Sequence, residues 1–205
     1  MTFASLAVDE VTKKLVQKLE FLREVEQLKT VLRRNYILGG LRRENDAEHS
    51  WHISLMAVLF FEDAIDPNID LLRVLKMLLI HDLVEIDAGD TYAFDNAGHQ
   101  DKDEREARAA DRIFSLLPKN LGDTLRGLWE EFDAGETPDA CYALALDRLQ
   151  PALQNYLYEG TVWKENGISP EQVLGRFDPL RDAVPELARI ADLVIEDAKK
   201  NGFFP

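Results

Sequence analysis

Residues 71–90 read LLRVLKMLLIHDLVEIDAGD, and this stretch indicates the fold class of the chain. From Leu71 to Ile80 the apolar residues leave almost no polar face, which is typical of a helix buried at the centre of a helical protein. Asp70 is placed as the N-cap, shortly after the turn signal Asp66-Pro67-Asn68. We therefore expect a central helix that begins after Asp70 and continues through His81 to at least Glu85.

The flanking sequence has the same helical periodicity, with apolar residues three and four positions apart. The helices expected from this pattern cover residues 8–31, 48–64, 102–117, 121–132, 138–159, 170–177 and 185–200. Loops are expected over residues 35–47 and 88–98, and Pro151 should kink the helix that contains it. Because no stretch alternates apolar and polar residues as a strand does, we predict one all-α domain, a helical bundle over residues 1–205.

The charge balance excludes one class of partner. The chain has 205 residues, with 38 Asp and Glu against 24 Lys and Arg, and a formal net charge of −14. A field of this sign repels a polyphosphate backbone, so we expect no nucleic-acid polymer as a partner. A small anion can still bind where a few arginines or a metal ion reverse the sign locally.

The sequence shows no sign of secretion, membrane insertion or disulfide bonding. Residues 1–9 lack the basic stretch followed by an apolar one that marks secretion, and we expect a cytoplasmic protein. The longest apolar runs, residues 55–61 and 74–80, are too short to span a bilayer, so no membrane association is expected. The single cysteine, Cys141, excludes an internal disulfide and a cysteine-rich zinc module.

The pair His81-Asp82 interrupts the apolar stretch where it should be most deeply buried. A carboxylate among apolar residues costs several kcal/mol unless it is paired, hydrogen-bonded or bound to a metal. Glu85 shares the helical face of this pair, and Asp87 and Asp90 follow closely. Such a density of negative charge calls for a cation, and imidazole with carboxylate ligands suits a divalent transition ion better than calcium.

Further ligands would have to come from other helices. His49 lies at the start of the helix that precedes the central one, and a short turn joins the two. These helices should pack antiparallel, which would place His49 beside His81. Asp147 is a lone charge among apolar residues and is the last candidate. His52 is expected to pack behind the site, and His99 to be exposed in a loop.

The order His49, His81-Asp82, Asp147 resembles the H…HD…D pattern of the HD-domain metal-dependent phosphohydrolases. Within that family the chain is most similar to the HD-domain 5'-deoxynucleotidases. The similarity rests on Leu28-Lys29 with Arg33, Arg43 with Glu48-His49-Ser50, His81-Asp82-x-x-Glu85-x-x-x-Gly89-Asp90, Leu128-Trp129-Glu130-Glu131 and Leu146-Asp147. It covers about residues 20–160, which we expect to form the metal-binding core of a single HD domain, with the helices of residues 168–201 packing on it.

The resemblance implies a role for each of these residues. One divalent ion (Mn, Co, Fe, Ni, Zn or Mg) would be bound by His49, His81, Asp82 and Asp147. The catalytic residues would be Glu85, as acid or base, and Asp90. The substrate contacts would be Arg33, Arg34, Tyr36 and Asp90. Some members of the family read the deoxyribose with a Trp just after the arginine; here Tyr36 is the only aromatic residue that could take that part.

The function implied is a phosphomonoesterase that hydrolyses (deoxy)nucleoside 5'-monophosphates to nucleoside and phosphate. Two alternatives remain: an HD-type phosphodiesterase or nucleoside triphosphate hydrolase, and a non-catalytic helical adaptor with a structural metal. Glu85 and the arginine cluster at residues 33, 34, 42 and 43 favour an enzyme, because a structural site needs neither. Only His99 lies between Asp82 and Asp147, which favours one metal ion over two. A homodimer is expected from the family resemblance alone.

Overall fold

A computed structural model describes residues 2–6, 8–40, 42–95 and 97–205, and almost all of its regular structure is helical. The α-helices are α1 (Glu10–Val25), α2 (Asp46–Leu59), α3 (Leu71–Ile80), α4 (Glu85–Ala88), α5 (Lys102–Ser115), α6 (Lys119–Ala134), α7 (Pro138–Leu157), α8 (Thr161–Asn166), α9 (Pro170–Leu174), α10 (Asp178–Ala183) and α11 (Pro185–Lys200). No helix in the described part of the chain is long and apolar enough to cross a membrane.

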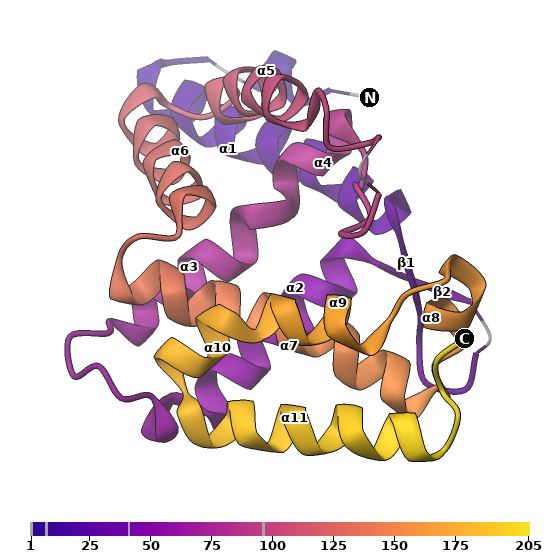
Figure 1. The fold of residues 1–205 in the computed structure, drawn as a ribbon. Coiled ribbons are helices and arrows are strands. Elements are labelled where there is room, and N and C mark those ends of the chain that lie inside the picture. Colours follow the sequence, from indigo (N-terminus) through magenta and orange to yellow (C-terminus); the bar gives the residue numbers. More distant parts are fainter. Residues whose placement is uncertain (1, 7, 41, 96) are drawn as a thin grey trace.

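Helix α7 runs through the middle of the bundle. It packs against α2, α3 and α6 on one side, and against α10 and α11 on the other (Figure 1). Its apolar residues Leu146 and Leu149 are buried, as are Val74, Met77 and Leu78 of α3. The predicted all-α helical bundle is therefore confirmed, and α10 and α11 do pack on its central helix; the division into a core and C-terminal helices stays a prediction.

Helix α3 is shorter than predicted. It ends at Ile80, and residues His81–Val84 form a 3-10 turn, η4, before the single-turn helix α4 begins at Glu85. Residues three apart lie on the same side of a 3-10 turn, so Asp82 and Glu85 share one face. The prediction of a continuous helix to Glu85 is therefore wrong. The apolar pattern of the sequence continues past Ile80 unchanged, so it does not reveal where the helix ends.

A two-stranded antiparallel sheet replaces the loop predicted for residues 35–47. Strand β1 (Leu32–Tyr36) pairs with β2 (Arg43–Asn45), with Leu32 opposite Asn45 and Tyr36 opposite Arg43. The prediction of no strand is wrong because these short segments, LRRNY and REN, are mostly polar on both faces. The helix predicted to reach residue 31 also ends earlier, at Val25, and the 3-10 turn η2 (Glu26–Thr30) leads into β1.

Two local features lead the chain into the site. Asn45 caps α2, because its side chain accepts a hydrogen bond from the Glu48 backbone N–H while the Glu48 carboxylate accepts one from the Asn45 backbone. At the other end, Gly89 closes α4 with a φ of +75°, a conformation that favours glycine. The chain then enters the expected loop after residue 88, which lines one wall of the site.

Candidate functional site

Three of the predicted metal ligands meet where α2, η4 and α7 converge. Nε2 of His49 lies 2.9 Å from Oδ1 of Asp147, and Nε2 of His81 lies 3.8 Å from the same oxygen. The two imidazole rings are 5.6 Å apart between centroids, as the antiparallel packing of α2 and α3 led us to expect. His49, His81 and Asp147 each offer one ligand atom within 4.8 Å of the others, so this group could hold a metal ion.

Both histidines are held by the ring nitrogen that faces away from Asp147. The Nδ1–H of His81 donates to the backbone carbonyl of Leu78 at 2.9 Å, and Nδ1 of His49 is hydrogen-bonded to Oε1 of Gln150 at 3.0 Å. Such contacts fix the tautomer and direct the other nitrogen toward a metal. Nε2 of His81 is buried and makes no hydrogen bond with any residue that the structure describes. A buried, unpartnered imidazole nitrogen beside carboxylates is the donor set that a divalent transition ion requires, so the residues fit a metal.

Asp82 completes the predicted ligand set. Its Oδ1 lies 3.0 Å from Nε2 of His81, and its Oδ2 accepts a hydrogen bond from Arg33 at 3.0 Å. Burial alone would raise the pKa of Asp82, but the positive charges of His81 and Arg33 outweigh it and lower this pKa to about 2. Burial would raise the pKa of Asp147, but the hydrogen bond from His49 and the positive charges of His49 and His81 outweigh it and hold this pKa well below its usual value.

His81 responds to the same negative charge. Burial favours its neutral form, yet the carboxylates of Asp82 and Asp147 raise its pKa to about 10. The imidazole thus keeps a proton that balances the carboxylates around it. A metal cation would balance the same charge, and its binding would release this proton.

A second group of carboxylates lies beside the first. Asp46, Glu85 and Asp90 each present an oxygen within 4.8 Å of the others, and this group could also hold a cation. One oxygen each of Asp46 and Glu85 is buried and finds no hydrogen-bond partner in the described part of the chain. Burial, with the nearby charge of Asp82, raises the pKa of Asp46 to about 7 and that of Glu85 well above its usual value. This raised pKa favours the protonated form of Glu85, a property that suits an acid/base residue.

Arg33 reaches from β1 into the centre of these acids. Its Nη1 lies 3.0 Å from Asp82, 3.4 Å from Asp46 and 3.9 Å from Asp90, and its Nε lies 3.9 Å from Glu44. Burial would lower the pKa of Arg33, but the surrounding carboxylates raise it. The charge of Arg33 is therefore already balanced by the chain itself.

The remaining predicted substrate residues lie in two places. Arg34 lines the pocket, with its guanidinium 5.9 Å from the ring centre of Tyr92. Tyr36 does not line the pocket: its ring packs 5.4 Å from that of Tyr158 and lies under the guanidinium of Arg43 at 3.9 Å. Tyr36 is thus apart from the other candidate residues.

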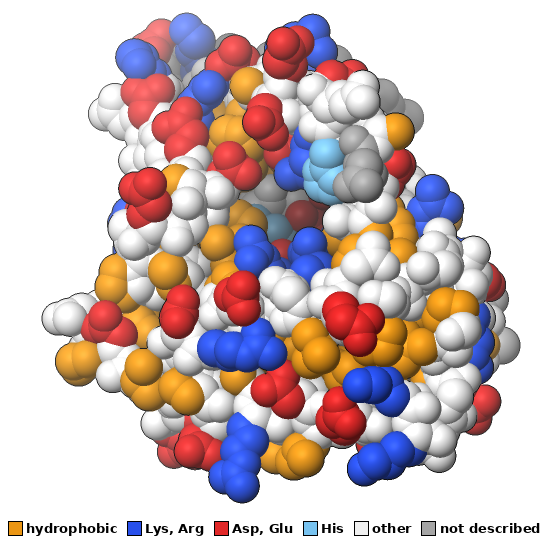
Figure 2. All heavy atoms as spheres, in the orientation of Figure 1, with side chains coloured by type: hydrophobic (Ala, Val, Ile, Leu, Met, Phe, Trp, Pro, Cys, Tyr) orange, Lys and Arg blue, Asp and Glu red, His pale blue; other side chains and the backbone are white. Residues whose placement is uncertain are grey.

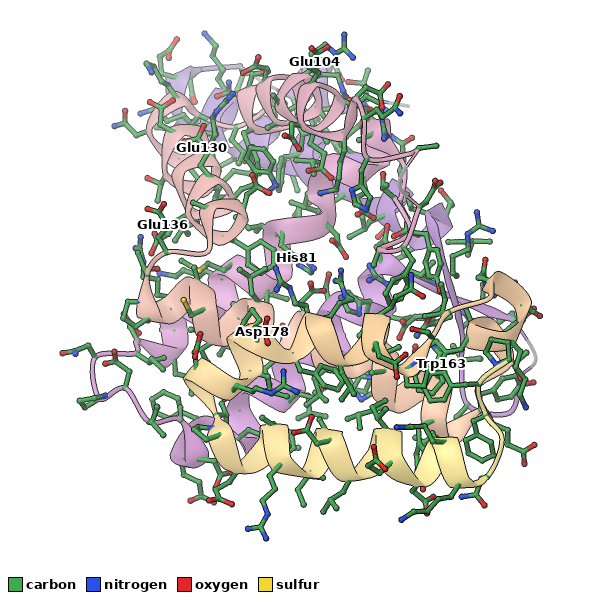
Figure 3. The ribbon with its side chains drawn as sticks, in the orientation of Figure 1. His81, Glu104, Glu130, Glu136, Trp163 and Asp178 are labelled. Carbon is green, nitrogen blue, oxygen red and sulfur yellow. The ribbon has the colours of Figure 1, made fainter. Side chains whose placement is uncertain are left out.

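His81, Asp82, Glu85, Asp90 and Asp147 form the floor of a cavity of about 300 Å³, a size typical of small-molecule sites. His49 and Asp46 are fully buried beneath this floor. Figure 2 shows it as a hollow with red and pale-blue side chains inside and blue Lys and Arg side chains at its edge. Figure 3 shows His81 between α3 and α6 on one side and α7 on the other. The exposed His99 is at its margin, and His52 lies behind it, with Nδ1 3.2 Å from the Gln150 amide that supports His49.

Sequence reasoning missed several residues of the site. Gln150 and Asp46 each lie three residues from a predicted ligand, and this helical spacing was the signal that could have found them. Glu44 is buried beside Arg33, but a lone acid in a polar strand gives no such signal. Arg148, which directly follows the predicted ligand Asp147, and Arg176, which lies in a part of the chain with no motif, also line the cavity.

Comparison with known proteins agrees with this geometry. A family model described as an HD domain matches residues 25–188. The human 5'-deoxynucleotidase HDDC2 is 32% identical over 163 residues, covering 78% of each protein. The 5'-deoxynucleotidase hdd1 of Schizosaccharomyces pombe is 28% identical over 144 residues, covering 68% of this chain and 71% of its own.

A solved structure is similar over nearly the whole chain. It is a predicted metal-dependent phosphohydrolase from Magnetospirillum magnetotacticum, 42% identical with a TM-score of 0.90, and the match covers 96% of this chain and 98% of that one. The family match and the relatives agree with the H…HD…D residues that meet at the cavity floor and directly beneath it. This chain belongs to the HD-domain phosphohydrolases.

Proposed function

We propose that the protein hydrolyses the phosphate ester of deoxynucleoside 5'-monophosphates. The observation that supports this most directly is the group of His49, His81 and Asp147, of which His81 and Asp147 line a cavity large enough for a nucleotide. The relatives named as 5'-deoxynucleotidases supply the substrate class. A pocket walled by aromatic side chains, among them Tyr92, Phe94 and Trp129, suits a base and a sugar.

The metal would be held by His49, His81, Asp82 and Asp147. When bound, a divalent ion at these residues supplies Lewis-acid chemistry, polarising a phosphoryl oxygen and making water more acidic. The protein fixes the donors in advance, since Leu78 and Gln150 orient the two imidazole rings. Arg33 holds the carboxylate of Asp82 in place.

Glu85 is the proposed acid/base residue. Its environment favours the protonated carboxyl, which can deliver a proton to the leaving 5'-oxygen and can later take one from water. Asp90 lies in the same group of carboxylates and lines the cavity, where it can accept a hydrogen bond from the substrate or from Glu85. Asp82 and Asp46 stand close enough to Glu85 to raise its pKa, so they assist by keeping the proton on it.

A substrate panel tests this function. The metal-loaded protein would be assayed for phosphate release from deoxynucleoside and ribonucleoside 5'-monophosphates, a nucleoside triphosphate and a cyclic dinucleotide. We expect hydrolysis of the monophosphates above the triphosphate and the cyclic dinucleotide. Because Tyr36 lies outside the cavity, it gives no reason for a preference for the deoxy over the ribo compounds. Faster cleavage of the diester or the triphosphate would contradict the monophosphate assignment, and no hydrolysis of any compound with any divalent metal would favour a structural site.

A further inference from the structure

The cations around the cavity fall into two kinds. Arg33 is balanced by the carboxylates described above, and Lys102 is paired with Glu106 at 3.0 Å. Arg34, Arg148 and Arg176 also line the cavity, and none of them makes an ion pair or a hydrogen bond through its side chain with any described residue. Arg34 is exposed, whereas Arg148 and Arg176 are partly buried. The hollow in Figure 2 has Lys and Arg side chains at the edge that faces α9 and α10.

The absence of a partner is unexpected in this molecule. The chain carries 38 carboxylates against 24 basic side chains, so an acid could readily be placed beside each arginine. Arg176 is only partly exposed, and burying a charge without a counter-charge costs free energy of folding. Residues that lower the stability of the fold without a structural benefit are commonly functional. An anionic ligand would supply the missing counter-charge.

Both arginines lie on well-packed elements close to the candidate metal ligands. Arg148 follows Asp147 directly on α7, the best-packed helix of the bundle. Arg176 lies in the 3-10 turn Gly175–Phe177, which is anchored by the buried ring of Phe177. Its guanidinium lies 5.9 Å from the ring centre of Phe94, in the loop on the opposite wall. Asp147, Arg148 and Arg176 line the same cavity, so the two arginines border its floor.

We propose that Arg148 and Arg176 bind the phosphoryl group of the substrate at its non-bridging oxygens, opposite the carboxylates that surround Arg33. The inference rests on the proposed function for the identity of the ligand, a phosphate monoester dianion. Two guanidinium groups can offer several parallel N–H donors to such a group. Arg33, whose donors already contact Asp82 and Asp46, would chiefly hold the acids in place.

The test uses inorganic phosphate as the probe on the metal-loaded protein. Its affinity would be measured by calorimetry, and by competitive inhibition wherever a nucleotide is hydrolysed, for Arg148→Gln, Arg176→Gln and the double variant. Each single variant should weaken phosphate about tenfold, the worth of one charge-assisted hydrogen bond, and the double variant more. KM for the nucleotide should rise by a similar factor. Lysine at either position should restore part of the affinity, because it keeps the charge but loses the fork of donors.

The control is Arg189→Gln, which removes an exposed arginine of α11 outside the cavity and should leave phosphate affinity unchanged. Thermal stability separates binding from a structural role. Removal of an unpaired charge should leave Tm unchanged or raise it, whereas a structural arginine would lower it. Unchanged phosphate affinity in the double variant would overturn the proposal even if nucleotides are hydrolysed. Loss of phosphate affinity in a protein that hydrolyses no nucleotide would support it and contradict the proposed function alone.

Discussion

Acidic side chains surround Glu85, and their negative charge favours the protonated form of its carboxyl group. Because a protonated carboxyl and an amide are similar in shape and charge, Glu85→Gln should keep the fold and the bound metal. It cannot give or take a proton, so turnover should fall about a hundredfold or more. Steady-state kinetics with metal analysis would check this. Near-normal kcat in the metal-loaded variant would show that Glu85 has no part in proton transfer.

His81 combines two contacts, one to the Leu78 carbonyl and one toward Asp147. Removing its ring would leave an incomplete set of ligands and unpaired buried carboxylates, so His81→Ala should lose both metal and stability. We expect one tightly bound transition ion per chain in the parent protein and almost none in the variant, as measured by elemental analysis after dialysis.

His99→Ala is the matched control, because this exposed histidine lies at the margin of the cavity and outside the ligand group. It should retain the metal of the parent. Full occupancy in His81→Ala would contradict the ligand assignment, and two tightly held ions in the parent would contradict the single-ion expectation. The carboxylate group of Asp46, Glu85 and Asp90 contains no imidazole, which suits a weakly held hard ion rather than a second tight one.

At the scale of elements, the helices were predictable where their apolar period was strong. The pattern fails in two places where tertiary structure decides instead. The apolar pattern of the sequence continues across the break after Ile80, so nothing in it marks the end of the helix. Strands β1 and β2 are too short and too polar to show the alternation of apolar and polar residues that marks a strand. Both irregular elements carry site residues: η4 brings His81 and Asp82, and β1 brings Arg33.

The ligand residues could be anticipated because a charge in an apolar helix is conspicuous in the sequence. Their convergence followed from the antiparallel packing of α2 and α3. The surrounding residues could not be anticipated, because the burial of Glu44 and the unpaired state of Arg176 depend on segments that meet only in the folded chain. The sequence therefore predicts the candidate metal ligands at the floor of the cavity but not the residues that form its wall.

The cap of α2 links an element to the site it carries. Asn45→Ala removes the N-cap hydrogen bond and should lower the free energy of unfolding by about 1 kcal/mol. Because α2 begins at Asp46 and presents His49 in its first turn, fraying there should also weaken metal binding. Chemical denaturation and metal titration would measure the two effects separately.

Helix α1 provides the comparison, since Asp9 caps it in the same way with Thr12 and lies far from the cavity in sequence and outside its lining. Asp9→Ala should lower stability without a change in metal affinity. Equal metal affinity in the two variants would mean that the start of α2 is held by packing rather than by its cap.

At the scale of the whole molecule, the chain concentrates part of its excess negative charge in one buried place. In the metal-free protein the pKa of Asp46 is about 7 and that of Glu85 is also raised, so the folded state binds protons that the unfolded state releases near pH 4. Stability due to these groups is present at low pH and is lost as pH rises toward their folded pKa values. His81, with a folded pKa of about 10, acts in the same direction between about pH 6.5 and 10.

The groups with lowered pKa values, Asp82 and Asp147, change their contribution only below about pH 4, where the unfolded carboxyls titrate. From pH 5 to pH 8 the free energy of unfolding of the metal-free protein should therefore fall, and Asp46→Asn should flatten this slope. Denaturation of the chelated protein at several pH values measures it, with Asp123→Asn, an exposed carboxylate of α6, as the control that keeps the slope. A bound divalent ion supplies the charge that the protons would otherwise supply, so metal loading should reduce the slope as well. A slope of the opposite sign in the metal-free protein would mean that the buried acids are balanced by the chain alone and have no need of a cation.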